Sequence, residues 1–499
     1  ICSAMRIGLV AVPLLVLVAI VALVPNHPAG RSPAEDTGVF LYAAERLLDG
    51  GAPYRDIWDH KLPGVYFVDA VGLALGGRVG IWVLQLVFLV AAVLISYRAL
   101  RREFGDVPAF VGSLAWLVAS PRLFLEQGQT NFVEFFALPL QFGALLLYTP
   151  PLTSARALTI GVLGGAAVLF KPTLVGIWIA IGLVTIVQRR LRAIAPIVAI
   201  AIGALLPLVV VAVWALARGI LDLMVDQTLV YNRAYASFMP ADTRIEDLIG
   251  GLRLTLPSGL VLITVTAWLY AVTTRRWGSP LVQIALVAFP LELVLATFGR
   301  GYHYYFLTWL PAMGVLAAYG VSELRRLAPP RLARMALVLG TLAMCVQPSL
   351  LVTRLALTHE GERFSRVASY VAANSRPDET VFIWGSHALV LVLAERLAPT
   401  KFVYQYGPLY TRGYSTPAHV DQLLADLQRN RPVLILDAST EGFITPPLDS
   451  VKFPTWTSVD IQYQALPETA KVIAFIEATY VRDGTEPTTG WPVWRLRAP

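Results

Sequence analysis

Charged residues are scarce in this sequence: Asp, Glu, Lys and Arg make up only 15% of its 499 residues, whereas 56% are hydrophobic. Soluble globular chains contain about 25% charged and 45–50% apolar residues, so this composition excludes a water-soluble enzyme of this length. It also excludes intrinsic disorder, which requires low hydrophobicity and high net charge. The formal net charge of +7 is too small a surplus to indicate binding to nucleic acid.

Cysteine and metal-binding motifs are also scarce. The two cysteines, Cys2 and Cys345, provide neither a disulfide framework nor a cysteine-based metal site. Asp56 and Asp59 lack partners for a metal, and no Asp-x-Asp motif indicates a metal-bound nucleotide sugar. We therefore expect no metal site, and the sequence identifies no cofactor. Lysine is much rarer than arginine and occurs at only five positions: Lys61, Lys171, Lys401, Lys452 and Lys471.

The apolar residues fall into blocks of about 17–25 residues, the length that a helix needs to cross a hydrocarbon core of about 30 Å. The predicted fold class is a polytopic α-helical membrane protein with about 11 transmembrane helices, and a short block at 65–77 could add one. The first block is longer than the apolar part of a signal peptide and no small-x-small cleavage site follows it, so we expect a retained helix. The predicted spans are 7–24, 79–97, 107–121, 132–149, 157–170, 173–188, 193–217, 257–274, 280–298, 304–320 and 335–353.

The distribution of basic residues predicts the orientation of these spans. With the N-terminus in the cytoplasm, every inner connection is short and carries arginine, whereas the outer loops carry most of the acids. This orientation places the loops 25–64 and 218–256, and everything after 354, outside the cytoplasm. The arginine-rich and alanine-rich composition is typical of bacteria, so we expect a multi-pass protein of the bacterial cytoplasmic (inner) membrane.

Hydropathy divides the chain into a transmembrane domain, 1–353, and an extracytoplasmic α/β domain, 354–499. In the second domain the patterns predict strands at 380–384 and 432–436 and helices at 362–373, 387–397 and 418–428. No glycine-rich loop that could cradle a phosphate follows these strands.

The outer loop 25–64 has a pattern of its own. Apolar residues at helical spacing over 39–48, stopped by Asp49-Gly50-Gly51, predict a short amphipathic helix at the membrane interface. Tyr54, Trp58, Tyr66 and Phe67 are interpreted as an interfacial aromatic belt.

Charged side chains are costly at membrane depth, so each one near a span needs a reason. Several lie at the outer ends of the predicted spans or in the first outer loop, and nothing comparable gathers on the inner side. This asymmetry predicts a functional site at the outer membrane surface. The candidates are Glu35, Asp36, Lys61, Glu134, Lys171, Glu292, Arg300 and His303.

Structural roles remain open for each of these candidates. Glu134 and Lys171 lie at helix ends where the helix dipole favours their charges. Lys61 could extend to the lipid headgroups, and the remaining loop residues could be solvated acids or turn residues. A second arrangement, Ser386 and His387 with Asp437, suggests a nucleophile triad. Adjacent Ser and His seldom meet correctly, however, so structural roles are favoured there.

Three segments of the first loop, 35–42, 47–50 and 53–64, resemble the first periplasmic loop of the GT-C superfamily of glycosyltransferases. The most similar group is the protein O-mannosyltransferase and lipid A aminoarabinose transferase family, with its bacterial cell-envelope relatives (glycosyltransferase family 39-like). Weaker matches occur at 131–134, 138–140, 170–172, 299–305 and 384–386.

The resemblance implies roles for individual residues. Asp36 matches the acidic residue that serves as the general base, although Glu35 precedes it where many members carry Asp followed by Glu, so Glu35 is the alternative. Lys61 matches the lysine that contacts the lipid phosphate, with one residue inserted before the proline, and Glu134 matches a second acid. Arg300 and Lys171 are further candidates for the phosphate, and His60, Tyr54 and His303 are further candidate site residues.

The chemistry of the outer surface leads to the same hypothesis independently. No nucleotide-sugar pool exists there, so a sugar donor has to arrive on a lipid such as a polyprenyl phosphate. A carboxylate would accept the proton of the acceptor hydroxyl, and cations would offset the charge developing on the departing phosphate. One base and a single displacement predict inversion at the anomeric carbon. The acceptor, which could be a lipid, polysaccharide or protein, is not specified by the sequence.

Two other functions remain open at this stage. About 11 spans could also form a transporter or flippase of lipid-linked sugars, although such proteins place charges near mid-membrane between repeats and the sequence shows no internal repeat. Alternatively, the chain could be a non-catalytic envelope scaffold whose outer domain binds a partner. In that case the clustered charges would be dispensable.

Overall fold

The computed structural model describes residues 2–30, 35–125, 131–238, 241–297, 300–358, 362–441 and 444–497. The chain forms two compact units, each built from three separate stretches. The first comprises Ile1–His27, Arg78–Val213 and Ala241–Thr358, and the second comprises Pro28–Gly77, Trp214–Pro240 and His359–Pro499. The predicted division of the chain at residue 353 remains a prediction, because it follows hydropathy whereas the units follow compactness.

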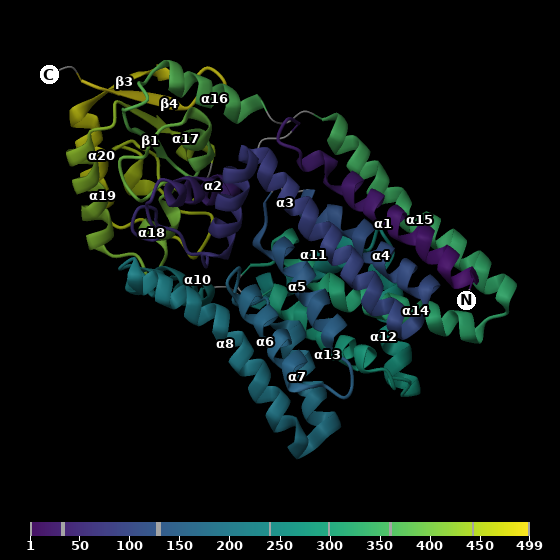
Figure 1. Cartoon of the computed structure of the whole chain (residues 1–499). Coiled ribbons are helices and arrows are strands. Elements are labelled where there is room, and N and C mark those ends of the chain that lie inside the picture. The colour runs from purple at the N-terminus through teal and green to yellow at the C-terminus, as the bar shows by residue number, and fades with distance from the viewer. Residues whose placement is uncertain are drawn as a thin grey trace. The chain divides into compact units, whose positions relative to one another are not determined.

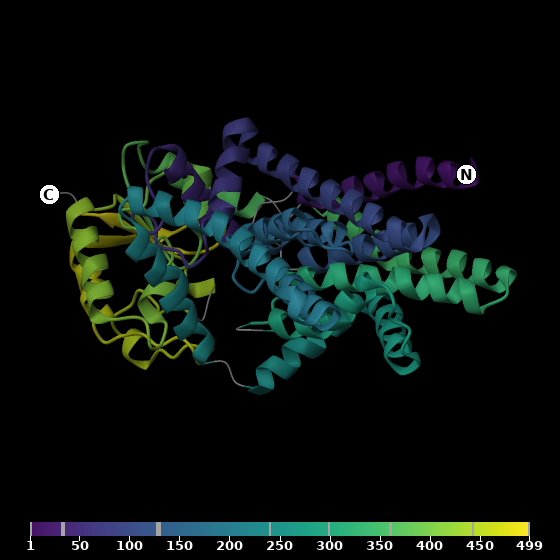
Figure 2. The same cartoon turned by 60° about the horizontal axis from the view of Figure 1, so that its bottom comes forward.

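The first unit is a bundle of helices, and α1 lies along its edge in both views (Figures 1 and 2). Except for α11, which lies in the predicted loop 218–256, these helices form where the predicted apolar blocks lie, and most of their buried side chains are apolar. Their bounds are α1 (Cys2–Leu23), α3 (Gly64–Phe104, from Arg78 onward), α4 (Asp106–Leu125), α5 (Val133–Leu147), α6 (Ser154–Val168), α7 (Gly176–Arg189), α8 (Ile194–Ala217, as far as Val213), α11 (Ala241–Thr255), α12 (Leu260–Thr274), α13 (Pro280–Ala296), the 3-10 helix η4 (His303–Trp309), α14 (Leu310–Leu327) and α15 (Pro330–Leu357).

All 11 predicted spans fall on helices of the described chain. By length and composition, six helical segments among the described residues can cross a membrane, or seven if the bent pair α11 and α12 counts as one span. Helices α5, α6 and α13 are apolar but have only 15, 15 and 17 residues. They extend about 22–26 Å, less than a hydrocarbon thickness of about 30 Å. The fold is a mostly helical, polytopic membrane protein, and the number of about 11 spans remains a prediction.

Two mostly buried helices, α4 and α14, form the centre of the bundle. Their backbones approach closely at Gly112, where a Cβ atom would lie only 2.8 Å from the carbonyl oxygen of Gly314. Small residues permit this kind of helix contact in membranes. Helices α8 and α15, in contrast, expose most of their leucine and valine side chains. Apolar surface of this extent is what a lipid-facing helix presents.

The second unit contains a four-stranded sheet with the order β1-β2-β4-β3. Strands β1 (Val381–Trp384) and β2 (Leu434–Asp437) are parallel, whereas β4 (Pro492–Leu496) is antiparallel to both β2 and β3 (Tyr480–Thr485). β1 and β2 are buried along their whole length, with helices on both sides of the sheet (Figure 1). These helices are α16 (Glu362–Ala373), α17 (Ala388–Ala394), α18 (Tyr406–Tyr410), α19 (Pro417–Asn430) and α20 (Thr469–Thr479).

Two earlier stretches complete the second unit. One contains α2 (Glu35–Leu48) and the start of α3, which breaks at Gly76 and Gly77, where Gly77 has a φ of 59°. The other contains α9 (Leu221–Val225), the π-helix η3 (Asp226–Val230) and α10 (Tyr231–Ser237).

Helix α2 is the helix predicted in the first outer loop. Its apolar residues, 39–44, are buried, and it packs against α17. The contact requires a glycine at position 38, because a Cβ atom there would lie 2.5 Å from the backbone nitrogen of Leu389. The location of this helix at a membrane interface remains a prediction.

Candidate active site

Asp59, His60 and Lys61 form a polar cluster in the second unit, just before α3. The Lys61 ammonium donates a hydrogen bond to Nε2 of His60 at 2.6 Å. An ammonium has no lone pair, so Nε2 is the acceptor and the imidazole proton is on Nδ1. Nδ1 lies 3.2 Å from the hydroxyl of Tyr404 and 3.3 Å from Oδ1 of Asp59. The three consecutive side chains therefore form one chain of hydrogen bonds that ends on a carboxylate.

The Asp59 carboxylate is the anchor of this cluster. It is buried, and it accepts hydrogen bonds from the hydroxyls of Tyr66 at 2.5 Å and Tyr404 at 2.8 Å. Burial alone would raise the pKa of Asp59, but the bonds from His60 and Tyr66 and the charge of Lys61 hold it well below its usual range. Asp59 is therefore ionised at neutral pH.

His60 is neutral at neutral pH. Burial and then the neighbouring Lys61 ammonium lower the pKa of His60, and the opposite influence of Asp59 and Asp36 does not outweigh them. A neutral imidazole with its proton on Nδ1 can accept from Lys61 and donate toward Asp59 at the same time. The electrostatics and the hydrogen-bond geometry therefore agree.

Two tyrosines hold the backbone at Lys61. The hydroxyl of Tyr54 donates to the Lys61 carbonyl oxygen at 2.8 Å. The hydroxyl of Tyr66, whose proton is directed to Asp59, lies 3.3 Å from the same oxygen. Tyr54 has a φ of 69°, uncommon for a tyrosine, and its side chain is fully buried. The prediction that Tyr54, Trp58 and Tyr66 form an interfacial belt is wrong in this respect, because all three side chains are buried and bonded inside the second unit.

The stretch 214–240 holds the same loop from another direction. The side-chain amide of Gln227, on the π-helix η3, accepts from the Asp59 backbone N–H at 3.1 Å and donates to the Tyr54 carbonyl at 2.7 Å. Asn232 donates to the His60 carbonyl at 2.8 Å. π-helices occur frequently at functional sites. The backbone around Lys61 is thus held by side chains from two separate stretches of the chain.

Helix α2 brings the predicted base to this cluster. Asp36 is half-buried in its first turn, and Phe40, one turn later, lies on the same helix face. The Phe40 ring centroid is 5.9 Å from the Lys61 ammonium, and the Asp36 charge acts on His60. The structure therefore brings Asp36, Tyr54, His60 and Lys61 together. The side chain of Glu35 lies outside the described part of the chain.

The first unit holds a second polar cluster, around Glu134 and Lys171. The Lys171 ammonium bonds Oε1 of Glu134 at 2.9 Å and lies over the ring of Tyr305, 2.8 Å from its centroid. The Glu134 side chain is 1% exposed, and its Oε2 has no hydrogen-bond partner among the described residues. Glu134 thus opens α5 as predicted, but it is also the partner of Lys171.

Arg300 and His303 belong to the same unit as this pair. Arg300 lies 5.9 Å from the ring centroid of Tyr302, and the N–H of Gly301 donates to Oδ2 of Asp247 at 2.7 Å. His303 begins η4, the helix that also carries Tyr305. These residues belong to one segment of the chain, and its Tyr305 contacts Lys171. That all candidate residues lie at one level of the outer membrane surface remains a prediction.

Glu292 has a structural role. Its Oε1 accepts from the backbone N–H of Ile177 at 3.0 Å and from Gln141 at 3.3 Å. It therefore caps the N-terminus of α7 from the neighbouring helix α13, where the helix dipole favours an acid. Position 176, directly before Ile177, requires a glycine, because a Cβ atom there would lie 2.5 Å from the Glu292 carboxyl group.

The triad suggested by Ser386, His387 and Asp437 is not formed. Asp437 accepts from the backbone and hydroxyl of Ser439, and the ring of His387 stacks on Trp491 at 4.8 Å. Among the described residues, no group of three His, Cys, Asp or Glu side chains comes together as a metal site.

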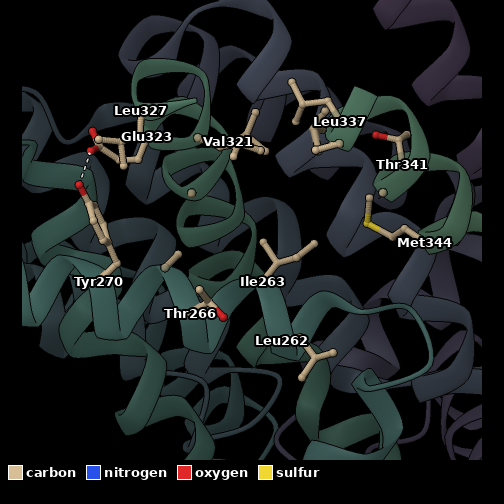
Figure 3. A pocket seen from close by; sticks show the side chains of 16 residues that line it. Leu262, Ile263, Thr266, Tyr270, Val321, Glu323, Leu327, Leu337, Thr341 and Met344 are labelled. Atoms are coloured by element: carbon tan, nitrogen blue, oxygen red, sulfur yellow. Dashed lines mark hydrogen bonds between the residues drawn. The ribbon is translucent and has the colours of Figure 1, made fainter. Parts of the chain in front are cut away.

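A cavity of about 490 Å³ lies in the first unit among α4, α12, α14 and α15 (Figure 3). Its lining is mainly apolar, with a polar end where the hydroxyl of Tyr270 donates to Glu323 at 3.1 Å. It contacts the last turns of α14, whereas η4 and Tyr305 precede the first turn of that helix. The cavity is therefore separate from the Glu134–Lys171 cluster.

Asp59, Tyr404 and Gln227 are not among the predicted site residues. In the sequence Asp59 stands out only as part of an incomplete metal-binding pair with Asp56, although its position directly before His60 and Lys61 is a usable signal. Tyr404 and Gln227 carried no such signal, because they lie 345 and 168 residues away from Asp59 in the chain.

Known proteins resemble this chain in fold. ArnT from Cupriavidus metallidurans, in a crystal structure bound to undecaprenyl phosphate, matches with a TM-score of 0.62 and 16% identity over 97% of both chains. An oligosaccharyltransferase from Archaeoglobus fulgidus, in a crystal structure tethered to an acceptor peptide, matches with a TM-score of 0.53 and 12% identity, over 98% of this chain and 74% of that chain. At these identities the likeness concerns the fold alone, and in fold it confirms the similarity to a lipid A aminoarabinose transferase that the first outer loop predicts.

A sequence profile, that of the competence-induced Ccs4 N-terminal domain family, matches residues 15–336. No curated protein sequence matches the chain.

Proposed function

The chain belongs to the competence-induced Ccs4 N-terminal domain family, and from its GT-C-like fold and the geometry around Lys61 we propose that it is a membrane glycosyltransferase. It moves a sugar from a polyprenyl phosphate to an acceptor hydroxyl, with inversion at the anomeric carbon. The ArnT structure of the same fold holds undecaprenyl phosphate, which supports a lipid-phosphate donor.

The observation that carries the proposal is the position of Lys61 beside helix α2, whose first turn carries Asp36, in the second unit. Phosphate binding needs a cation, and deprotonation of a hydroxyl needs a carboxylate within reach of the same sugar carbon. Lys61 is held by His60 and lies near the face of α2 that carries Asp36. Both groups are thus available in one unit, and the loop that carries Lys61 is held by Tyr54, Tyr66 and Gln227.

The reaction follows from these two groups. The acceptor oxygen forms a bond to the anomeric carbon while its proton passes to the Asp36 carboxylate. The bond from that carbon to the phosphate oxygen breaks, and its electron pair remains on the phosphate. Lys61 offsets the resulting negative charge, since an ammonium acts on phosphate as a point charge. The proton on Asp36 then leaves to solvent.

The cluster in the first unit receives a secondary role. Lys171 already pairs with Glu134, so much of its charge is neutralised before any phosphate arrives. We therefore assign the donor phosphate to Lys61, and the roles of Arg300, Lys171, Glu134 and His303 remain those that the family resemblance implies. The site and the domain after residue 354 lie on the extracytoplasmic side of the membrane, because the inner connections carry the arginines.

The test is transfer by the purified full-length protein in detergent, with lipid extracts of its own membranes as donor and acceptor. We expect release of a free polyprenyl phosphate together with a glycosylated acceptor, both identified by mass spectrometry. Asp36→Asn should lower the rate by about 10²–10⁴-fold, the usual contribution of a general base, while Glu35→Gln, the matched neighbouring change, leaves it close to wild type.

Two outcomes would contradict the proposal. A flippase has nothing to transport in micelles, so an inactive wild-type protein in detergent with active flipping in vesicles would favour the transporter. Near-normal turnover of Asp36→Asn with a loss in Glu35→Gln would move the base to Glu35.

A further inference from the structure

In the contact between Lys61 and His60, the lysine donates and the histidine accepts. The two side chains are therefore not two cations that bind a phosphate together. At 2.6 Å the ammonium has to donate and the imidazole has to accept. His60 therefore offers its lone pair to Lys61 and keeps its proton for the side of Asp59 and Tyr404. An anionic phosphate would instead require a donor at Nε2.

The other side of the imidazole is fixed by several groups. The Tyr404 hydroxyl both faces Nδ1 and donates to Asp59. The ring centroids of Tyr231 and Tyr235 lie 5.0 and 6.3 Å from the ring centroid of His60. His60 is consequently held in one orientation, with Nε2 directed at the Lys61 ammonium.

The hydrogen bond from Lys61 to His60 reduces an entropic cost that arises when a lysine binds a phosphate. Its long side chain has many rotamers, whose freedom is lost when it binds a phosphate. A fixed acceptor near the ammonium removes part of that freedom beforehand, and such pre-organisation improves affinity. The ammonium has three donors, so one bond to His60 leaves two for a phosphate.

We propose that His60 is a positioning residue, which holds the Lys61 ammonium in place for the lipid phosphate by accepting its hydrogen bond at Nε2 while Asp59 and Tyr404 anchor Nδ1. The proposal rests on the proposed function in one respect, the assignment of Lys61 to the phosphate. It adds that the Asp59–His60–Lys61 cluster acts as a unit.

Two variants with the same amide group test this role. In His60→Asn the amide reaches the position of Nδ1, so the contact toward Asp59 is kept and the acceptor for Lys61 is lost. In His60→Gln the amide reaches the position of Nε2, where its oxygen can accept from Lys61. The measurement is the Kd of undecaprenyl phosphate for the full-length protein in detergent, with the melting temperature of each variant as a check on folding.

We expect His60→Asn to weaken binding about tenfold, as for loss of a hydrogen bond to a charged group, and His60→Gln to stay within about threefold of wild type. In a Lys61→Gln background, His60→Asn should have no further effect, because its action runs through Lys61. Equal losses in His60→Asn and His60→Gln, or the same loss with and without Lys61, would overturn the proposal.

The same data separate this inference from the proposed function. If Lys61→Gln binds undecaprenyl phosphate as tightly as wild type, the proposed phosphate ligand is wrong. If Lys61→Gln weakens binding but His60→Asn does not, only the positioning role is wrong.

Discussion

At the scale of single residues, the Asp59–His60–Lys61 cluster makes the stability of the second unit depend on pH. The pKa of His60 is lowered in the folded protein, whereas the unfolded chain titrates near the ordinary value of about 6.5. Between these two values the unfolded chain binds more protons, so stability falls as the pH is lowered below about 6.5. Asp59, with its lowered pKa, loses its stabilising effect only in stronger acid, below about pH 4.

This direction of the pH dependence can be tested by comparing wild type with His60→Gln, because glutamine at position 60 has no titratable group. We expect the melting temperature of wild type to fall more than that of the variant between pH 7 and pH 5. Glu45, whose pKa burial raises to about 7, acts in the opposite direction, and His387, whose pKa burial lowers to about 4, acts in the same direction. Both are present in both proteins, so the difference isolates His60. Identical pH profiles would contradict this account, because they would show that the pKa of His60 is the same in the folded and the unfolded protein.

Some residues of the candidate site could be predicted from the sequence, and others could not. Asp36 and Lys61 were predicted from motif spacing, and the structure places them in one unit. Tyr404 and Gln227 were not predictable, because their role depends on the folding of distant stretches onto one loop. Tyr54 was misinterpreted, since an aromatic residue near a membrane span looks the same whether it faces lipid or the interior of a soluble domain.

At the scale of secondary-structure elements, the position of α2 determines where Asp36 lies. The helix approaches α17 at Gly38, and a Cβ atom there would come within 2.5 Å of the Leu389 backbone. Gly38→Ala should therefore displace α2, lower the melting temperature by several degrees and reduce transfer activity together. The measurements are thermal unfolding and turnover in detergent.

The matched control for this change is Gly250→Ala in α11, where a Cβ atom meets nothing within 4 Å. Alanine is the better helix former, so this variant should be as stable as wild type or slightly more stable. A harmless Gly38→Ala would mean that α2 and α17 do not pack as described.

Elements were predicted best where periodicity or hydropathy is strong. The strands at 381–384 and 434–437 and the helices α16, α17 and α19 agree with the predicted segments. Strands β3 and β4 were missed, because Arg482, Asp483 and Gly484 interrupt the apolar pattern of β3 and its outer residues are exposed. The predicted spans 132–149 and 280–298 are longer than α5 and α13, because hydropathy continues past the point where each of these helices ends.

At the scale of the whole molecule, the orientation in the membrane decides which sugar donors are accessible. Arginine placement predicts that α19 faces the extracytoplasmic side and that the start of α15 is cytoplasmic. The exposed positions Gln428 and Arg331 report on these two regions. In a protein with Cys2 and Cys345 replaced by serine, Gln428→Cys should react with a membrane-impermeant maleimide in intact spheroplasts. Arg331→Cys should react only after permeabilisation, and the reverse pattern would contradict both the topology and the lipid-donor argument.

The scarcity of lysine permits a direct test of the central claim, that Lys61 binds the phosphate of a polyprenyl lipid. With only five lysines in the chain, ¹⁵Nζ labelling introduces few signals, and undecaprenyl phosphate in a phosphorus-free detergent supplies a single ³¹P nucleus. Solid-state NMR of the complex should show ³¹P dephasing by ¹⁵N at a distance under about 4 Å, as expected for an ammonium–phosphate hydrogen bond. The dephasing should disappear in Lys61→Gln and persist in Lys171→Gln. Dephasing that survives in Lys61→Gln and is lost in Lys171→Gln would contradict the account.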